Sequence, residues 1–298
     1  MKLSSPQLLL DAQAALGEGP AWDFARKRLY WVDIYAGHLH IYDPKTNLDE
    51  KIEVDAPLGC AAPTRSGNLI LGLRNSIAAL SLDTVKLTIL ASPEARLPGN
   101  RFNDGKCAPD GRFLAGTMDN SETEASGALY SYSPDGTLKT LVAGVRISNG
   151  LAWSPDYKTM YYIDTPTFNV MAYDYDVASG EIGNPRVAVS IPPRLGFPDG
   201  MTSDMQGRLW IALWGGAAVT VWDPASSQLL ESISIPAKNV TSCVFGGENG
   251  TDLFVTSARK GLSPADLAEY PLTGGLFRIQ TNVEGMPTFV FGDSMLDI

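Results

Sequence analysis

The side chains best suited to chemistry in this sequence are oxygen donors that recur where successive β-rich segments begin. Counting four residues back from equivalent places in six repeated segments gives Glu18, Leu58, Asn103, Asn149, Asp199 and Thr241. All of these except Leu58 carry a side-chain oxygen, and glycine directly follows Glu18, Asn149 and Asp199. Glycine lets the backbone turn sharply beside a ligand or a neighbouring strand. Equivalent positions in successive stacked segments form a ring, so we expect these side chains to converge at one place.

Two carboxylates and two carboxamides that point at one place favour a metal ion. Such groups are costly to bury without partners, and a cation relieves that cost. Oxygen donors without His or Cys suit hard or borderline divalent ions such as Ca²⁺, Mg²⁺ or Mn²⁺, and a sparse ligand set leaves room for water or substrate. The alternative is that each polar residue makes only turn or side-chain-to-backbone hydrogen bonds.

The segments that carry these residues repeat along the whole chain. A turn followed by a short aromatic and aliphatic strand recurs at intervals of 40, 44, 47, 49 and 44 residues, at Leu29, Leu69, Phe113, Met160, Leu209 and Leu253. This spacing is typical of a four-stranded propeller blade. Because blades stack on one another, the chain should fold as one unit. The sequence predicts an all-β, six-bladed β-propeller with a central metal-binding channel, in which residues 1–298 form one domain.

Composition excludes several classes of function. The 298 residues are 44% hydrophobic and carry a net charge of −10, which repels nucleic acid and anionic membranes. No stretch approaches the about 18 consecutive apolar residues of a membrane span, and the N-terminal segment lacks a secretory pattern. Cys60, Cys107 and Cys243 form no CxxC pair, so we expect buried thiols in a reducing compartment. We expect a cytoplasmic protein with no nucleic-acid or membrane partner; nothing in the sequence predicts an oligomeric state.

Other catalytic chemistries find little support. The sequence has no GxSxG motif, and its two histidines, His38 and His40, are alternate residues that share one strand face. We expect them to be a surface or blade-packing pair rather than a base. The tryptophans recur at blade positions and are expected to pack between blades, with Trp153 and Trp214 the candidates for reaching the channel.

Six motifs resemble the regucalcin (senescence marker protein)/gluconolactonase family. They are LGEGP at 16–20, RFNDGK at 101–106, AGTM at 115–118, ISNGLAWS at 147–154, PDGM at 198–201 and TSCVFGG at 241–247. The resemblance covers essentially the whole chain. It implies a six-bladed propeller with one divalent metal in its channel that hydrolyses a sugar (aldono-) lactone to the aldonic acid, a carboxylic ester hydrolase of carbohydrate metabolism.

The resemblance also implies roles for individual residues. Glu18, Asn149 and Asp199 would bind the metal, and Arg101 and Asn103 would contact sugar hydroxyls. The run after AGTM departs from the family pattern, because Ser121 stands at the place of a substrate-contacting Glu and Glu122 follows one residue later. Both are candidate substrate contacts. Ca²⁺ is the first candidate cofactor, and Zn²⁺, Mn²⁺, Mg²⁺ and Fe²⁺ are also compatible.

Opening a lactone requires a polarised carbonyl, a water molecule and a proton for the leaving ring oxygen. Asp199 is the first candidate for the general base, because carboxamides cannot accept that proton, and Glu18 is the weaker candidate. Two other functions stay open. A non-enzymatic calcium-binding or regulatory propeller would not need Arg101 and Asn103 beside the metal, and a lactonase or esterase of a non-sugar ester would need a more apolar channel mouth.

Overall fold

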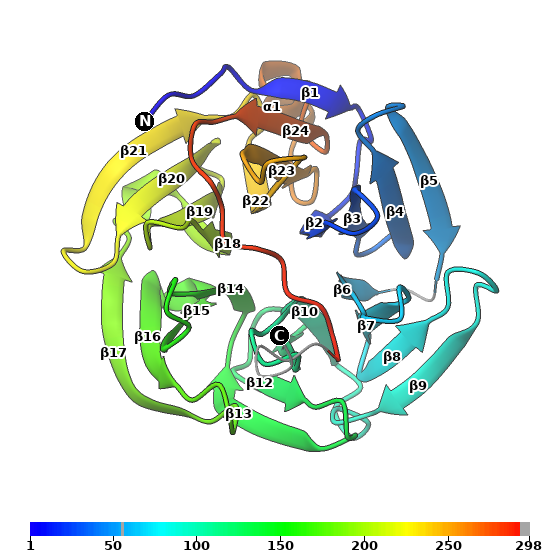
Figure 1. Cartoon of the computed structure of the whole chain (residues 1–298). Coiled ribbons are helices and arrows are strands. Elements are labelled where there is room, and N and C mark those ends of the chain that lie inside the picture. The colour runs from blue at the N-terminus through cyan, green and yellow to red at the C-terminus, as the bar shows by residue number, and fades with distance from the viewer. Residues whose placement is uncertain (55–56, 293–298) are drawn as a thin grey trace.

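The chain folds as a six-bladed β-propeller, as the sequence predicts (Figure 1). The structure is a computed structural model that describes residues 1–54 and 57–292. Each blade is an antiparallel sheet of four strands, and the first strand of each of the six blades lies next to the central channel. The blades therefore place six equivalent strands around one axis.

The first three blades follow the chain order. Blade 1 contains β2 (Gly17–Asp23), β3 (Arg28–Asp33), β4 (His38–Asp43) and β5 (Leu48–Glu53). Blade 2 contains β6 (Leu58–Pro63), β7 (Leu69–Leu73), β8 (Ser76–Leu80) and β9 (Leu87–Ala91). Blade 3 contains β10 (Asn100–Cys107), β11 (Phe113–Asp119), β12 (Gly127–Tyr132) and β13 (Leu138–Val145).

The last three blades include both chain ends. Blade 4 contains β14 (Ser148–Trp153), β15 (Thr159–Asp164), β16 (Asn169–Tyr175) and β17 (Ile182–Ser190). Blade 5 contains β18 (Phe197–Ser203), β19 (Leu209–Trp214), β20 (Ala218–Asp223) and β21 (Gln228–Ser234). Blade 6 contains β22 (Asn239–Gly246), β23 (Asp252–Ala258), β24 (Leu276–Gln280) and the N-terminal β1 (Gln7–Leu10).

Short helical turns complete the fold. They are η1 (Thr165–Thr167), η2 (Pro193–Leu195) and α1 (Pro264–Glu269). Ser263 caps α1, because its side chain accepts a hydrogen bond from the backbone of Asp266 while the Asp266 carboxylate accepts one from the Ser263 backbone. Among the described residues, no helix has the length and apolar character needed to cross a membrane.

The ring is closed by pairing between the two ends of the chain. Strand β1 pairs antiparallel with β24, and Gln7 lies opposite Arg278. Blade 6 thus takes its outermost strand from the start of the chain and its other three from the end. This pairing covers an edge of β24 that would otherwise offer unpaired backbone groups.

Every innermost strand is interrupted at the same level by a shift in register. The shift follows Glu18 in β2, Leu58 in β6, Phe102 in β10, Asn149 in β14, Pro198 in β18 and Val240 in β22. Such a β-bulge bends a strand and re-aims a side chain. The repeated bulge is the local reason why the predicted site residues face the channel.

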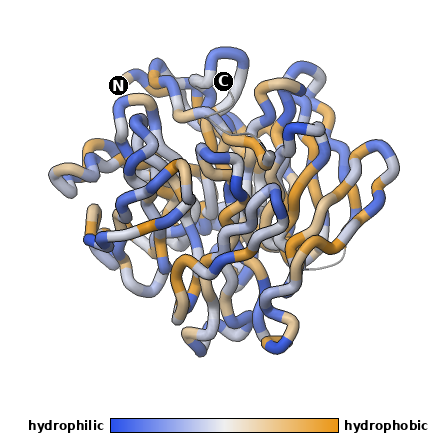
Figure 2. The backbone as a smooth tube through the Cα atoms, turned by 60° about the horizontal axis from the view of Figure 1, so that its bottom comes forward, coloured by the Kyte–Doolittle hydropathy of each residue, from blue (hydrophilic) through white to orange (hydrophobic). Residues whose placement is uncertain are grey.

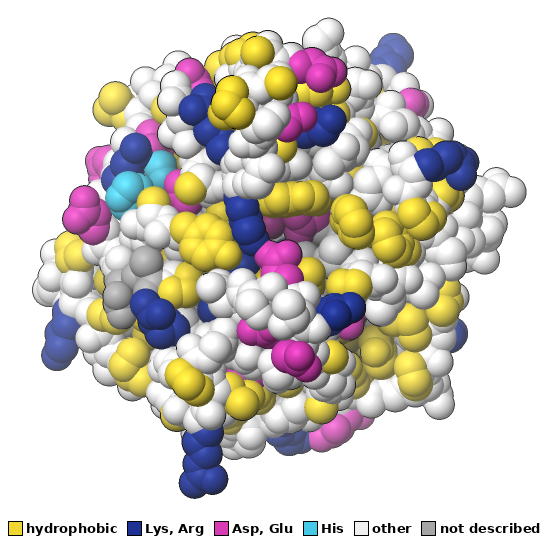
Figure 3. Space-filling model, turned by 180° about the vertical axis from the view of Figure 1, so that it is seen from behind, with side chains coloured by type: hydrophobic (Ala, Val, Ile, Leu, Met, Phe, Trp, Pro, Cys, Tyr) yellow, Lys and Arg dark blue, Asp and Glu magenta, His cyan; other side chains and the backbone are white. Residues whose placement is uncertain are grey.

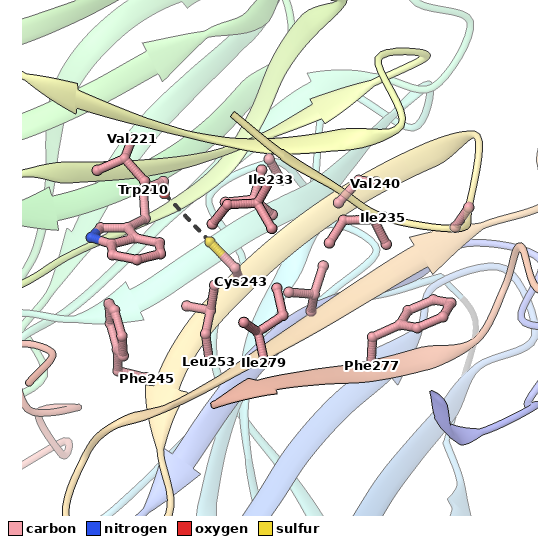
Figure 4. Packing of buried hydrophobic residues seen from close by; sticks show 14 of the residues in the cluster. Trp210, Val221, Ile233, Ile235, Val240, Cys243, Phe245, Leu253, Phe277 and Ile279 are labelled. Carbon is pink, nitrogen blue, oxygen red and sulfur yellow. Dashed lines mark hydrogen bonds between the residues drawn. The ribbon is translucent and has the colours of Figure 1, made fainter. Parts of the chain in front are cut away.

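The core consists of apolar clusters between neighbouring blades. Figure 4 shows the cluster in which Trp210 of blade 5 lies beside Cys243 and Phe245 of blade 6. Figure 2 shows hydrophobic residues concentrated along the strands and hydrophilic residues in many of the turns. All three cysteines are buried and free, as predicted. His40 is buried, lies 2.7 Å from Asp49 and stacks on Trp31, so it packs within its blade.

The C-terminal segment 283–292 crosses the channel on the face that Figure 1 shows. The Met286 amide donates to the Ser203 carbonyl at 2.9 Å, and the Phe291 amide donates to the Pro63 carbonyl at 2.9 Å. The segment therefore joins blade 5 to blade 2 across one end of the channel. The opposite end stays accessible.

Candidate metal centre and active site

An open cavity of about 390 Å³ occupies the end of the channel opposite the C-terminal segment. Figure 3 shows that face, with a hollow near its centre and acidic, basic and apolar side chains around it. Four of the six register positions line this cavity, namely Glu18, Asn103, Asn149 and Asp199. The other two do not line it. Leu58 belongs to an apolar cluster, and the Thr241 hydroxyl donates to the Gly17 carbonyl at 2.6 Å.

Two buried carboxyl groups, Glu18 on β2 and Asp199 on β18, form the acidic part of the cavity. Burial, and then repulsion from Asp104, raises the pKa of Glu18 to about 8. Burial, and then repulsion from Glu18, raises the pKa of Asp199 well above its usual range. Gly19, at φ 53°, donates its backbone N–H to Glu18 Oε2 at 2.8 Å and partly offsets this effect. Burial and mutual repulsion therefore disfavour the ionised forms of both carboxyl groups, and a cation beside them would favour ionisation.

The carboxamide of Asn149 is held in one orientation by its neighbours. Its Nδ2 donates to Thr165 Oγ1 at 2.8 Å, and that hydroxyl donates to the Pro198 carbonyl at 2.8 Å. Its Oδ1 accepts from Asn103 Nδ2 at 3.1 Å. Asn103 Nδ2 also donates to the Ser148 carbonyl at 2.8 Å. These hydrogen bonds orient the Asn149 carboxamide so that its oxygen faces Asn103. That oxygen accepts one hydrogen bond from Asn103 and retains a second lone pair.

Arg101 is buried beside Asn103 and is held by several acceptors. Its Nη1 donates to Asn103 Oδ1 at 2.6 Å and to the Phe102 carbonyl at 3.0 Å, and its Nε donates to Asn120 Oδ1 at 3.1 Å. The guanidinium lies 5.5 Å from the centre of the Tyr35 ring. These contacts present a fixed, planar cation to the cavity. Asn103 is largely committed to positioning Arg101 and Asn149.

The cavity mouth is crossed by an ion pair between Glu122 and Lys260. Both residues line the cavity, and the Lys260 ammonium lies 5.4 Å from the centre of the Tyr35 ring. Ser121 does not line the cavity, because its hydroxyl donates to Asp119 Oδ2 at 2.5 Å. The structure thus brings Glu122 to the cavity and keeps Ser121 in the turn beside it.

Several cavity-lining or supporting residues were not predicted from the sequence. They are Asp104, Thr165 and Lys260. Asp104 lies within the RFNDGK motif at 101–106, so its position carried a signal. Thr165 and Lys260 come from connections between strands, outside the repeated register. Of the two tryptophans considered for the channel, Trp214 lines this cavity.

The donor set fits a hard divalent cation. The cavity lining contains no His or Cys, and within residues 1–54 and 57–292 no three Asp, Glu, His or Cys side chains gather to hold a metal. Glu18, Asp199 and the Asn149 carboxamide are therefore the oxygen ligands available, and a bound cation would oppose the burial that raises the pKa values of the two acids. Non-protein ligands would complete the coordination.

Comparison with known proteins identifies the family. The family model for the SMP-30/Gluconolactonase/LRE-like region matches residues 16–259. The chain belongs to this family. The match includes every site residue named above except Lys260, which lies one residue beyond it.

Relatives in this family are similar over nearly their full length. A putative sugar lactone lactonase, YvrE, of Bacillus subtilis (strain 168) is 38% identical over 275 residues, which are 92% of this chain and 94% of that protein. Regucalcin of Pongo abelii is 38% identical over 278 residues, 92% of this chain and 93% of that protein. The crystal structure of regucalcin from Agrobacterium tumefaciens, described as a calcium-binding protein, matches with a TM-score of 0.92 at 27% identity and covers 97% of both chains.

Proposed function

We propose that this protein is a divalent-metal-dependent lactonase that hydrolyses a sugar (aldono-) lactone to the aldonic acid. The observation that carries the proposal is the pair of buried carboxyl groups, Glu18 and Asp199, which face an open cavity beside Arg101. Family membership and the relative named sugar lactone lactonase support the same reaction. The charged and amide side chains in the lining, Arg101, Asn103 and Glu122 among them, favour a sugar over an apolar ester.

Glu18, Asn149 and Asp199 would hold the cation. Ca²⁺ is our first choice because the available donors are all oxygens. When bound, the cation supplies Lewis-acid catalysis for carbonyl addition. Its charge would also keep both carboxyl groups ionised near neutral pH, against the burial that raises their pKa values.

The rest of the cavity would bind and orient the sugar. Arg101 presents N–H donors to ring hydroxyls, and Asn103 holds that guanidinium in place. Glu122, which pairs with Lys260, would accept a hydroxyl hydrogen at the mouth, with Ser121 in the adjacent turn. Phe197 and Trp214 supply an apolar wall against which a sugar face can pack.

The proton transfers require one base that can also act as an acid. In its ionised state, Asp199 accepts a proton from the attacking water as the water oxygen bonds to the lactone carbonyl carbon. The same proton then goes to the ring oxygen as the carbon–oxygen ester bond breaks. The products are a carboxylic acid and a free hydroxyl, so one water is consumed in each turnover.

A pH-indicator assay on metal-stripped protein tests the proposal. Glucono-, galactono- and xylonolactone are each assayed with Ca²⁺, Mn²⁺, Zn²⁺, Mg²⁺ or Fe²⁺ restored singly. We expect acid release above the spontaneous rate only when a metal is restored. Spontaneous rates throughout, with metal still bound, would contradict the lactonase and favour a calcium-binding propeller.

Substitution of the proposed metal ligands should abolish turnover without unfolding the propeller. Asp199→Ala and Asn149→Ala are each expected to abolish turnover and weaken metal binding, because each removes an oxygen ligand, while circular dichroism still reports a folded propeller. An Asp199→Ala protein that is active and metal-replete would contradict the assignment.

A further inference from the structure

Two basic side chains of the open cavity, Arg101 and Lys260, lie against the same aromatic ring. The Arg101 guanidinium is 5.5 Å and the Lys260 ammonium 5.4 Å from the centre of the Tyr35 ring. A cation at such a distance interacts favourably with the π system. Tyr35 therefore brings two positive charges together beside the cavity that both residues line. Figure 3 shows basic and acidic side chains meeting at the hollow on this face.

The guanidinium of Arg101 is buried and has neutral hydrogen-bond partners. It donates to the side-chain oxygens of Asn103 and Asn120 and to the Phe102 carbonyl. In the part of the chain that the structure describes, no carboxylate forms an ion pair with it. A buried charge without an opposite charge beside it is costly, so this position favours the arrival of an anion.

Lys260 shares its charge with Glu122 in the ion pair at the cavity mouth. The two side chains are 31% and 41% exposed, and an exposed pair of this kind stabilises a protein little, so it can separate at small cost. The ammonium donates one hydrogen to Glu122 and has two more for a ligand. The Lys260 backbone is fixed, because its amide donates to the Ala15 carbonyl at 2.9 Å and its carbonyl accepts from Asn239 Nδ2 at 3.1 Å.

The charges of the cavity lining leave one positive charge in excess. The described residues of the lining include three acids and two bases, namely Glu18, Asp199, Glu122, Arg101 and Lys260. The buried pair of acids adds no net charge, because it is neutral when protonated and balances a divalent cation when ionised. Glu122 then compensates only one of the two bases. This local excess stands against a net charge of −10 for the whole chain.

We propose that the substrate is a sugar lactone that carries a carboxylate, and that Lys260 binds this carboxylate. The inference rests on the proposed function and adds to it an acidic group on the substrate and a residue that selects for it. One excess positive charge matches a singly charged carboxylate better than a doubly charged phosphate. The cavity of about 390 Å³ has the size of a small-molecule site and accommodates one sugar ring with such a substituent.

Two lactones that differ in a single group test this inference. D-glucaro-1,4-lactone and D-glucono-1,4-lactone share ring and hydroxyl configuration, but carbon 6 is a carboxylate in the first and a hydroxymethyl group in the second. The measurement is kcat/KM for each lactone at neutral pH and constant ionic strength, with the restored metal. For wild type we expect the acidic lactone to be preferred by about tenfold or more, since it gains a charge-assisted hydrogen bond.

Substitutions at the mouth should change this preference in opposite directions. Lys260→Met keeps an unbranched side chain against Tyr35 without the charge, and is expected to lower the preference by about tenfold. Glu122→Gln removes the competing carboxylate and should raise it. Lys238→Met is the matched control, because that ammonium lies 5.4 Å from the centre of the Tyr270 ring but Lys238 does not line the cavity. Its preference should equal that of wild type. Circular dichroism verifies folding.

The outcomes separate this inference from the proposed function. Hydrolysis of both lactones without a preference, or with a preference that Lys260→Met retains, would overturn the inference and leave the lactonase intact. If Lys260→Met does not fold, an unchanged preference in Glu122→Gln overturns it equally.

Hydrolysis of neither lactone would contradict the proposed function instead. Calorimetry then measures the binding of both lactones to metal-stripped wild type and Lys260→Met. Tighter binding of the glucaro-lactone that Lys260→Met loses would still support a carboxylate site at Lys260. Equal binding of the two lactones to wild type would overturn that site as well.

Discussion

Arg101 is the residue whose substitution should separate substrate binding from metal binding. Arg101→Lys keeps the charge but loses the planar fork that reaches Asn103, Asn120 and the Phe102 carbonyl together. Loss of one or two charge-assisted hydrogen bonds, each about 1.5–3 kcal/mol, should raise KM or lower kcat by about tenfold or more. Metal content should be unchanged. Kinetics equal to wild type would assign Arg101 a structural role only.

The buried carboxyl group of Glu18 should make the metal-free protein less stable as the pH rises. Its pKa is about 8 in the folded chain, against 4.5 as the ordinary value. Between these values the folded state holds a proton that the unfolded state has released, so the free energy of unfolding falls with rising pH. Urea titrations at pH 5 and pH 8 measure it.

Glu18→Gln is the control for this pH effect, because it removes the titrating group and keeps the shape. We expect it to match wild type near pH 5 and to exceed wild type in stability near pH 8. Parallel pH profiles for the two metal-free proteins would show that Glu18 does not hold a raised pKa. Added Ca²⁺ should stabilise wild type most at pH 8, where ionising the two acids costs least.

Residues that share the repeated register could be predicted, whereas residues that reach the cavity from elsewhere could not. Glu18, Asn149 and Asp199 precede equivalent strands, so counting along the sequence placed them together. Lys260 follows β23 of blade 6, yet it meets Tyr35 of blade 1 and Glu122 of blade 3 at the end of the channel, which the spacing of the repeat does not predict. Thr241 occupies the same register, yet its hydroxyl bonds to a neighbouring backbone, which sequence spacing alone does not reveal.

Glycines beside the bulges allow neighbouring inner strands to approach closely. A Cβ on Gly200 would lie 2.1 Å from Ser242 Oγ and 2.5 Å from Ser242 Cβ on the next blade. Gly200→Ala should therefore push β18 from β22, cost about 1–3 kcal/mol of stability and displace Asp199. Gly183→Ala on β17, where a Cβ would meet nothing within 4 Å, is the control. Equal thermal midpoints for the two variants would contradict this reason for Gly200.

The inner strands of each blade were easier to predict than the outer ones. Strands β3, β7 and β11 contain the aromatic and aliphatic runs that revealed the repeat, because they are buried on both faces. Strands β5 and β21 are mostly exposed and carry little apolar pattern. Segment 283–292 has no counterpart in the repeat, so its passage across the channel could not be predicted from sequence spacing.

The closed ring makes the six blades depend on one another. Each blade buries its apolar faces against two neighbours, and β1 ties the start of the chain to β24. A blade that opened alone would expose both interfaces, so we expect residues 1–298 to unfold as one cooperative unit. Tryptophan fluorescence and far-ultraviolet circular dichroism should give coincident urea transitions for wild type.

Deletion of residues 1–10 should make unfolding of the six blades less cooperative, because it removes β1 and leaves the backbone edge of β24 unpaired. We expect a lower urea midpoint and transitions that no longer coincide between the two probes, since blade 6 can then open before the others. Deletion of residues 1 and 2, which stops before β1, is the matched control and should behave as wild type. Coincident transitions at an unchanged midpoint after the longer deletion would show that β1 does not hold the ring closed.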